Sequence, residues 1–133
     1  MRVVIDTNVL ISAFIATGKS HRVLEHCVVH HTLVLSQFIL DEPHEKLISK
    51  FHYSPEIADE AVQLLQSKIE LVVPLPLPSP VCRDSEDDTI LATAVTGVCA
   101  RIITGDKDLL ALQRFNNVAI LSPADFAQQE GVV

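Results

Sequence analysis

The chain contains no tryptophan, one tyrosine and only four glycines in 133 residues, and it has no repeat and no tract of a single residue. A helix that spans a bilayer needs about 20 consecutive apolar residues, whereas the longest apolar runs, such as 71–73, are far shorter. Disordered, collagen-like, low-complexity and membrane classes are therefore excluded. Residues 1–5 lack the layout of a signal peptide, so we expect a cytoplasmic protein.

Cysteine and positive charge are also scarce. The three cysteines, Cys27, Cys82 and Cys99, are odd in number and widely spaced, which argues for reduced core residues rather than a disulfide framework or a zinc knuckle. Ten Lys and Arg oppose 17 Asp and Glu, giving a net charge of −7. Such a chain does not coat nucleic acid through its overall charge. A nuclease that uses divalent cations still fits, because its carboxylate cluster is itself negative.

Apolar residues, by contrast, make up 48% of the chain. A chain of this length buries about 65–70% of its surface, enough for one core, so we expect a single domain over residues 1–133. Short β-branched runs predict strands at 2–5, 33–35, 69–73, 101–103 and 118–121. Alternate prolines at 74–80 forbid helix and predict an extended connection. Strands separated by helical patterns indicate an α/β sandwich with a mostly parallel sheet.

Helical spacing of apolar residues fills the segments between these strands. One helix is expected after a cap at Ser20, another is interrupted or begins near Pro43, and a third follows Ser54. In the second half, helices are expected at 87–98 and 109–112, and a last one opens at Ser122.

Acidic residues follow two of the predicted strands. Residues 3–5 lead into Asp6, and 102–103 lead into Asp106. Parallel strands end at one edge of a sheet, where ligands bind in this architecture, so the two acids are expected to share a site. A third acidic group, 84–88, precedes a helix. On a helical wheel Asp87 follows the sheet-facing stripe of Ala94 and Val98, whereas Asp88 is displaced from it.

Glu42 comes six residues after Ser36, about one turn into the next helix, and is within reach of the same edge. Each of these acids also suits a helix cap or first turn, and that alternative stays open for the individual residues. Carboxylates that converge to about 4 Å repel one another by about 4 kcal/mol per pair at an effective dielectric near 20. Mg²⁺ or Mn²⁺ relieves this repulsion and activates water, so no Ser, Cys or His nucleophile is needed.

In this order the residues resemble the PIN domain family of metal-dependent ribonucleases. The matching segments are Val4-Ile5-Asp6-Thr7-Asn8, Ser36 with Glu42, residues 84–94, and Thr104-Gly105-Asp106-Lys107-Asp108. Within the family the chain looks most like short bacterial or archaeal proteins grouped with the VapC-type toxins of type II toxin–antitoxin systems.

The resemblance implies a three-layer α/β/α fold, dependence on Mg²⁺ or Mn²⁺, and endonucleolytic cleavage of single-stranded RNA. The residues that match the family's catalytic, metal-ligating quartet are Asp6, Glu42, Asp87 and Asp106, and the supporting residues are Asn8, Asp84, Asp88, Thr104 and Asp108. Pro43 leaves open an exchange of roles between Asp41 and Glu42. The run 84–88 leaves the third ligand open among Asp84, Asp87 and Asp88.

We therefore expect a toxin-type endoribonuclease with RNA as substrate, an antitoxin protein as partner, a homodimer as assembly, and no membrane association. One alternative is a Mg²⁺-dependent phosphotransfer domain, receiver-like or phosphatase, that uses Asp6 or Asp106 as phosphoacceptor. Another is a non-catalytic binding module whose acidic face docks a basic protein. The six histidines have neither cysteine partners nor an HExxH pattern, so we expect them mostly at the surface and predict no zinc site.

Overall fold

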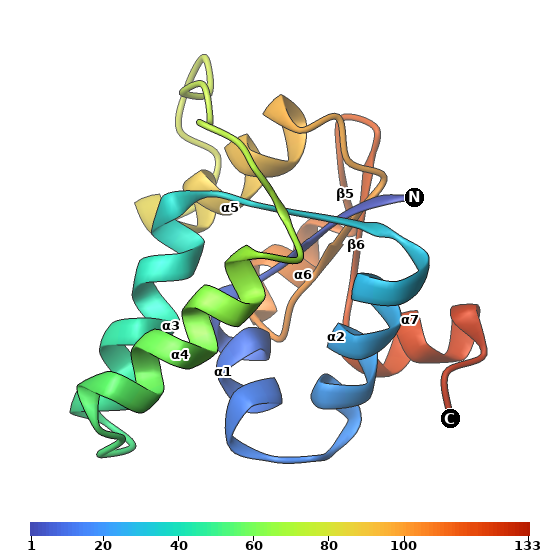
Figure 1. The fold of residues 1–133 in the computed structure, drawn as a ribbon. Coiled ribbons are helices and arrows are strands. Elements are labelled where there is room, and N and C mark those ends of the chain that lie inside the picture. Colours follow the sequence, from blue (N-terminus) through green and yellow to red (C-terminus); the bar gives the residue numbers. More distant parts are fainter.

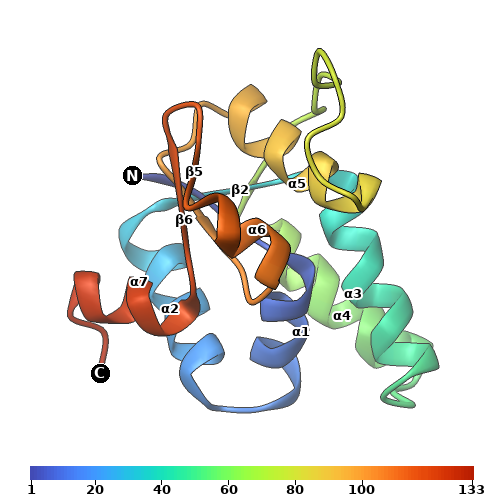
Figure 2. The ribbon, with the colours of Figure 1, turned by 180° about the vertical axis from the view of Figure 1, so that it is seen from behind.

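The computed structural model describes residues 1–133 and has a six-stranded sheet flanked by helices (Figures 1 and 2). The strands are β1 (Arg2–Ile5), β2 (Thr32–Leu35), β3 (Glu70–Leu71), β4 (Arg101–Ile103), β5 (Arg114–Phe115) and β6 (Val118–Leu121). Their order is β3-β2-β1-β4-β6-β5. All neighbours run parallel except β5 and β6, which confirms the expected α/β class with a mostly parallel sheet.

Seven helices connect and cover these strands, and none is long and apolar enough to cross a bilayer. They are α1 (Thr7–Ile15), α2 (Lys19–His30), α3 (Gln37–Ser49), α4 (Pro55–Gln66), α5 (Ser85–Thr96), α6 (Lys107–Leu112) and α7 (Pro123–Glu130).

The central strands are buried on both faces. In β1, Val3, Val4 and Ile5 are all fully buried, as β-branched residues of an inner parallel strand are expected to be. Helix α5 packs against β1, β2 and β4. Helix α2 packs against β2 and also contacts α1 and α7. The apolar sequence of these short strands therefore produces a sheet enclosed by helices.

Pro43 does not interrupt or begin a helix, contrary to the sequence prediction. Helix α3 runs continuously from Gln37, with Ser36 at its N-cap position, and the proline is buried within it. The two acids before Pro43 differ in their surroundings, and which of them takes the ligand role stays a prediction. Asp41 is exposed and accepts a hydrogen bond of 2.8 Å from Gln37 Nε2, whereas the Glu42 side chain is only 21% exposed.

Other predicted boundaries shift by a few residues because of how the chain is capped. Gly18, not Ser20, occupies the N-cap position of α2. Helix α6 begins two residues earlier than predicted, since Asp106 caps it. The predicted strand at 69–73 is reduced to β3, and the short strand β5 was not predicted. Residues 74–80 contain no helix or strand, as expected, and form the olive segment above α5 in Figure 1.

Candidate metal centre

Asp6 and Thr104 stand side by side at the carboxyl ends of β1 and β4. The Asp6 amide donates to the Ile103 carbonyl at 2.9 Å, which continues the strand pairing by one residue. Thr104 Oγ1 donates to Asp6 Oδ2 at 2.7 Å and accepts from the Asp106 amide at 3.0 Å. Because Thr104 is fully buried, one hydroxyl fixes the positions of two acids that are 100 residues apart in the sequence.

Both strand-end aspartates are also helix caps. Asp6 Oδ1 accepts from the Thr7 amide at 2.6 Å at the start of α1. Asp106 Oδ1 accepts from the amides of Asp108 and Leu109, at 2.8 and 3.0 Å, at the start of α6. The cap interpretation is therefore correct for both residues. Asp6 accepts hydrogen bonds through both oxygens, from Thr7 and Thr104, whereas the cap of α6 uses Oδ1 of Asp106 alone.

Asp87 lies in the first turn of α5 and is the most perturbed of the acids. It is 8% exposed, and carboxylate oxygens of Asp87, Asp106 and Asp108 lie within 4.8 Å of one another. Burial, with the negative charges of Asp106, Asp84, Asp6 and Asp108, raises the pKa of Asp87 to about 6. Burial also raises the pKa of Asp6, although the Thr104 hydrogen bond opposes this. The cluster thus holds uncompensated negative charge.

The two neighbouring candidates for the third ligand have other partners. Asp84 caps α5 and accepts from the Glu86 amide at 2.9 Å. Asp88 accepts from the amides of Cys82 and Val81, at 2.8 and 3.1 Å. Burial opposes the effect, but these amides hold the pKa of Asp88 below its usual value. Of the three, only Asp87 joins Asp106 and Asp108.

The structure does not bring Glu42 into this group of three acids. Its Oε2 lies 3.9 Å from Lys46 Nζ on the same face of α3, and its role as a ligand stays a prediction. Asn8 is exposed on α1 beside the Gly105 turn, with its Nδ2 3.9 Å from the position of a Cβ on that glycine.

Asp108 marks the solvent side of the cluster. Its side chain is 44% exposed and pairs with Arg83 at 2.9 Å. Arg83 was not predicted as a site residue, and its position directly before the acidic run 84–88 is the one indication of it in the sequence. Because the Arg83 side chain is 87% exposed, water screens its charge and it neutralises the buried aspartates poorly.

This donor set has a definite chemical preference. Grouped carboxylate oxygens at the carboxyl edge of a parallel sheet suit a hard divalent cation such as Mg²⁺ or Mn²⁺, and the Asp87 carboxylate accepts no hydrogen bond from the protein that would compete. Grouped carboxylates of this kind are one means by which enzymes that act on phosphate esters hold a catalytic divalent cation.

The chain belongs to the PIN domain family. The family model, described as PIN domain, matches residues 2–108, a range that includes Asp6, Glu42, Asp87, Asp106 and Asp108. PIN domains are nucleases that generally use a divalent metal.

A solved structure with the same fold is the "Crystal structure of VapBC2 from Rickettsia felis bound to a DNA fragment from their promoter". The match has a TM-score of 0.66 and 14% sequence identity, and it covers 92% of this chain and 98% of the matched chain. The three-layer PIN fold expected from the sequence is thereby confirmed. No curated protein matches the chain.

Proposed function

We propose that this PIN domain is a metal-dependent endoribonuclease that cleaves single-stranded RNA and serves as the toxin of a toxin–antitoxin pair. The observation that carries the proposal is the convergence of Asp87, Asp106 and Asp108, with Asp6 held beside them by Thr104. An acid whose pKa is raised to about 6 by its acidic neighbours gains most from a cation placed among them.

Asp6, Asp87 and Asp106 would hold the metal, with Asp108 at the outer side and Glu42 as a further predicted ligand. A divalent cation held by these residues would supply stabilisation of charge on phosphoryl oxygens and a water of lowered pKa as nucleophile. Thr104 orients Asp6 and Asp106, and the α6 amides fix Asp106 Oδ1. The carboxylates therefore keep their positions without a cation, which lowers the cost of organising the site.

The test of this activity is cleavage of a randomised single-stranded RNA pool by purified protein. We expect fragments with Mg²⁺ or Mn²⁺, none in EDTA, and none with Asp106→Asn. Asp125→Asn is the matched control, because it makes the same change at an exposed position on α7. Undiminished cleavage in EDTA, equal cleavage by Asp106→Asn, or no cleavage of the pool by the metal-loaded protein would each contradict the proposal.

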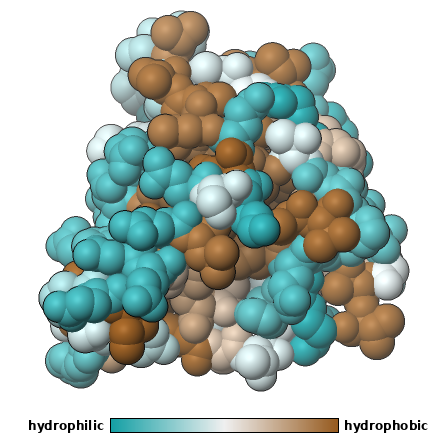
Figure 3. Space-filling view, viewed as in Figure 1, coloured by the Kyte–Doolittle hydropathy of each residue, from teal (hydrophilic) through white to brown (hydrophobic).

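A second feature supports the antitoxin partner. Helices α1, α2 and α4 enclose an apolar groove of about 480 Å³, lined by Phe14, Leu24, Val28, Leu64 and Leu65 among others. The Leu64 side chain remains 65% exposed, and hydrophobic surface lies between hydrophilic borders on this face of the molecule (Figure 3). Such a groove accepts the apolar face of an amphipathic helix, and we assign that helix to an antitoxin.

The docking of an antitoxin in this groove is tested by co-expressing the protein with the product of the reading frame next to its gene. We expect a complex that Leu64→Lys weakens strongly. Ile57→Lys is the matched control, because Ile57 is also on α4 and 55% exposed but does not line the groove. Equal loss of binding in both variants, or in neither, would rule out this docking site.

A further inference from the structure

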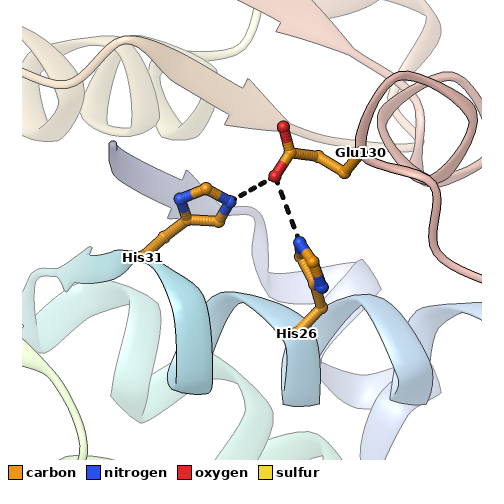
Figure 4. Close-up of side chains that lie close together, drawn as sticks. All are labelled: His26, His31 and Glu130. Atoms are coloured by element: carbon orange, nitrogen blue, oxygen red, sulfur yellow. Dashed lines mark hydrogen bonds and ion pairs between the residues drawn. The ribbon is translucent and has the colours of Figure 1, made fainter.

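Three side chains that the sequence does not connect converge on the far side of α2 from the groove residues. His26 lies on α2, His31 directly follows that helix, and Glu130 ends α7 (Figure 4). Glu130 Oε1 lies 3.1 Å from His26 Nε2 and 2.5 Å from His31 Nε2. The three ligand atoms are all within 4.8 Å of one another.

This cluster is separate from the acidic centre. His31 directly precedes β2, and its Nδ1 lies 3.0 Å from the amino group of Met1, which precedes β1. Both positions belong to the amino ends of parallel strands, whereas Asp6 and Asp106 follow the carboxyl ends of β1 and β4. The two groups therefore lie at opposite edges of the sheet.

We propose that His26, His31 and Glu130 form a second metal site, which takes a borderline transition-metal ion of the Zn²⁺ type. Two imidazole nitrogens and one carboxylate oxygen are a common zinc ligand set, and three protein ligands leave a fourth position for water. Mg²⁺ is not expected here, because it prefers oxygen ligands.

The distances require little rearrangement. In a tetrahedral site with bonds of about 2.0–2.1 Å, ligand atoms are about 3.3 Å apart. The two nitrogen–oxygen distances of 3.1 and 2.5 Å need to open only slightly for an ion to replace the two hydrogen bonds. On His26 the imidazole proton then resides on Nδ1, and the Nε2 lone pair faces the metal. On His31 the Nδ1 accepts from the Met1 amino group at 3.0 Å. Metal binding through Nε2 of His31 therefore places the ring proton on Nδ1 and requires the Met1 amino group to release one proton and accept from Nδ1 instead.

The surroundings hold the ligands in place and leave an entry route. Both imidazoles lie in T-shaped arrangements with the ring of Phe126, at centroid distances of 6.4 Å for His26 and 6.0 Å for His31, and Phe126 is fully buried. The side chains of His26, His31 and Glu130 are 20%, 10% and 24% exposed. An ion bound here would cross-link α7 to the C-terminal end of α2 and thereby stabilise the carboxyl-terminal part of the fold.

The experiment is a Zn²⁺ titration of the metal-stripped protein by calorimetry, with the melting temperature measured in parallel. We expect one ion per chain at this cluster, resolved from any ion at the acidic centre by repeating the titration with Asp106→Asn, and a rise in melting temperature. His31→Gln and Glu130→Gln should each weaken Zn²⁺ binding by about 100-fold or more, because even residues that only orient metal ligands are worth about 10- to 100-fold. Glu130→Gln keeps the shape of the side chain, and the melting temperatures of both variants in EDTA report whether they fold.

Two controls make the outcome specific. His30→Gln removes an exposed imidazole beside His31 that contributes no ligand atom, and we expect normal Zn²⁺ binding. Asp106→Asn alters only the acidic centre and should also bind Zn²⁺ at this site. Absence of Zn²⁺ binding to the wild-type protein would overturn the proposal. So would folded His31→Gln and Glu130→Gln proteins that bind Zn²⁺ as the wild type does, whatever the outcome of the RNA experiment.

Discussion

Asp106 serves two purposes, and two substitutions separate them. Its Oδ1 caps α6 through the amides of Asp108 and Leu109, while its charge raises the pKa of Asp87. Asn caps a helix about as well as Asp does, whereas Ala in place of a capping residue costs about 0.5–2 kcal/mol. Asp106→Asn thus removes the repulsion and keeps the cap, but Asp106→Ala removes both.

We therefore predict that these two variants have different melting temperatures in EDTA. Asp106→Asn should melt at or above the wild-type temperature, because relief of the repulsion is not offset by loss of the cap. Asp106→Ala should melt below Asp106→Asn. Thermal melts with and without Mn²⁺ check this, and both variants should lose most of the stabilisation that Mn²⁺ gives to the wild type. An Asn variant that is less stable in EDTA yet stabilised normally by Mn²⁺ would make Asp106 a purely structural residue.

The individual acids also show where sequence reasoning ends. Asp6, Asp87 and Asp106 were found because they follow apolar strands or open an apolar helix, and those patterns are local. The partners of Asp88 were not predictable, because its acceptor role depends on how the chain turns at Val81 and Cys82. The pairing of His31 with Glu130, 99 residues away, has no local pattern at all and follows only from the packing of α7 on α2.

At the scale of elements, the existence of the strands and of most helices could be predicted from apolar periodicity. The predicted and observed elements differ mainly in the residues at which they begin and end. Val98, predicted to share a helical stripe with Asp87, lies outside the helix, because α5 ends at Thr96 and Val98 has a φ of 51°. Asp87 nevertheless faces the cluster, because Ala94 is fully buried on the same stripe. Pro43 was misjudged because a buried position inside α3 tolerates it, which local propensity does not reveal.

Gly97, the C-cap residue of α5, provides a test of how this helix packs against the sheet. A Cβ at this position would lie 2.7 Å from Val34 Cγ1 on β2 and 3.2 Å from Cys99 Sγ. We predict that Gly97→Ala lowers the free energy of unfolding by about 1–3 kcal/mol through overpacking.

Gly105→Ala is the matched control for this substitution. The nearest atom to its added Cβ, Asn8 Nδ2, is 3.9 Å away, so it should change stability far less. Denaturant titrations of both variants check the prediction. Equal stability of the two proteins would show that the C-terminal end of α5 does not pack closely against β2.

At the scale of the whole molecule, the site makes metal-free stability depend on pH. The pKa of Asp87 is about 6 in the folded protein, against an ordinary value of 3.8, so folding favours its protonated form. That contribution is complete below about pH 4 and is lost as the pH rises through about 6. The pKa of Asp6 is raised in the same direction. The lowered pKa values of Asp88 and Glu130 act in the acid range instead, where their contributions are lost as the pH falls.

We therefore predict that in EDTA the protein is less stable at about pH 7 than at about pH 5. The full pKa difference corresponds to up to about 3 kcal/mol, of which about 1 kcal/mol is lost between pH 5 and pH 7. Asp87→Asn should show a smaller decrease over the same interval, and saturating Mn²⁺ should abolish the decrease in the wild type. The check is a pair of denaturant titrations at each pH. If wild type and Asp87→Asn lost stability equally between the two pH values, the raised pKa of Asp87 would be refuted.

The central claim is that the aspartates at the carboxyl edge of β1 and β4 hold a divalent cation, and a Mn²⁺ titration followed by electron paramagnetic resonance tests it most directly. We predict a discrete Mn²⁺ site in the wild type that is lost in Asp87→Asn and in Asp106→Asn. Asp88→Asn should retain it, since Asp88 accepts from the amides of Val81 and Cys82. Binding that persists in Asp87→Asn and Asp106→Asn, or that disappears only in Asp88→Asn, would contradict this account of the site.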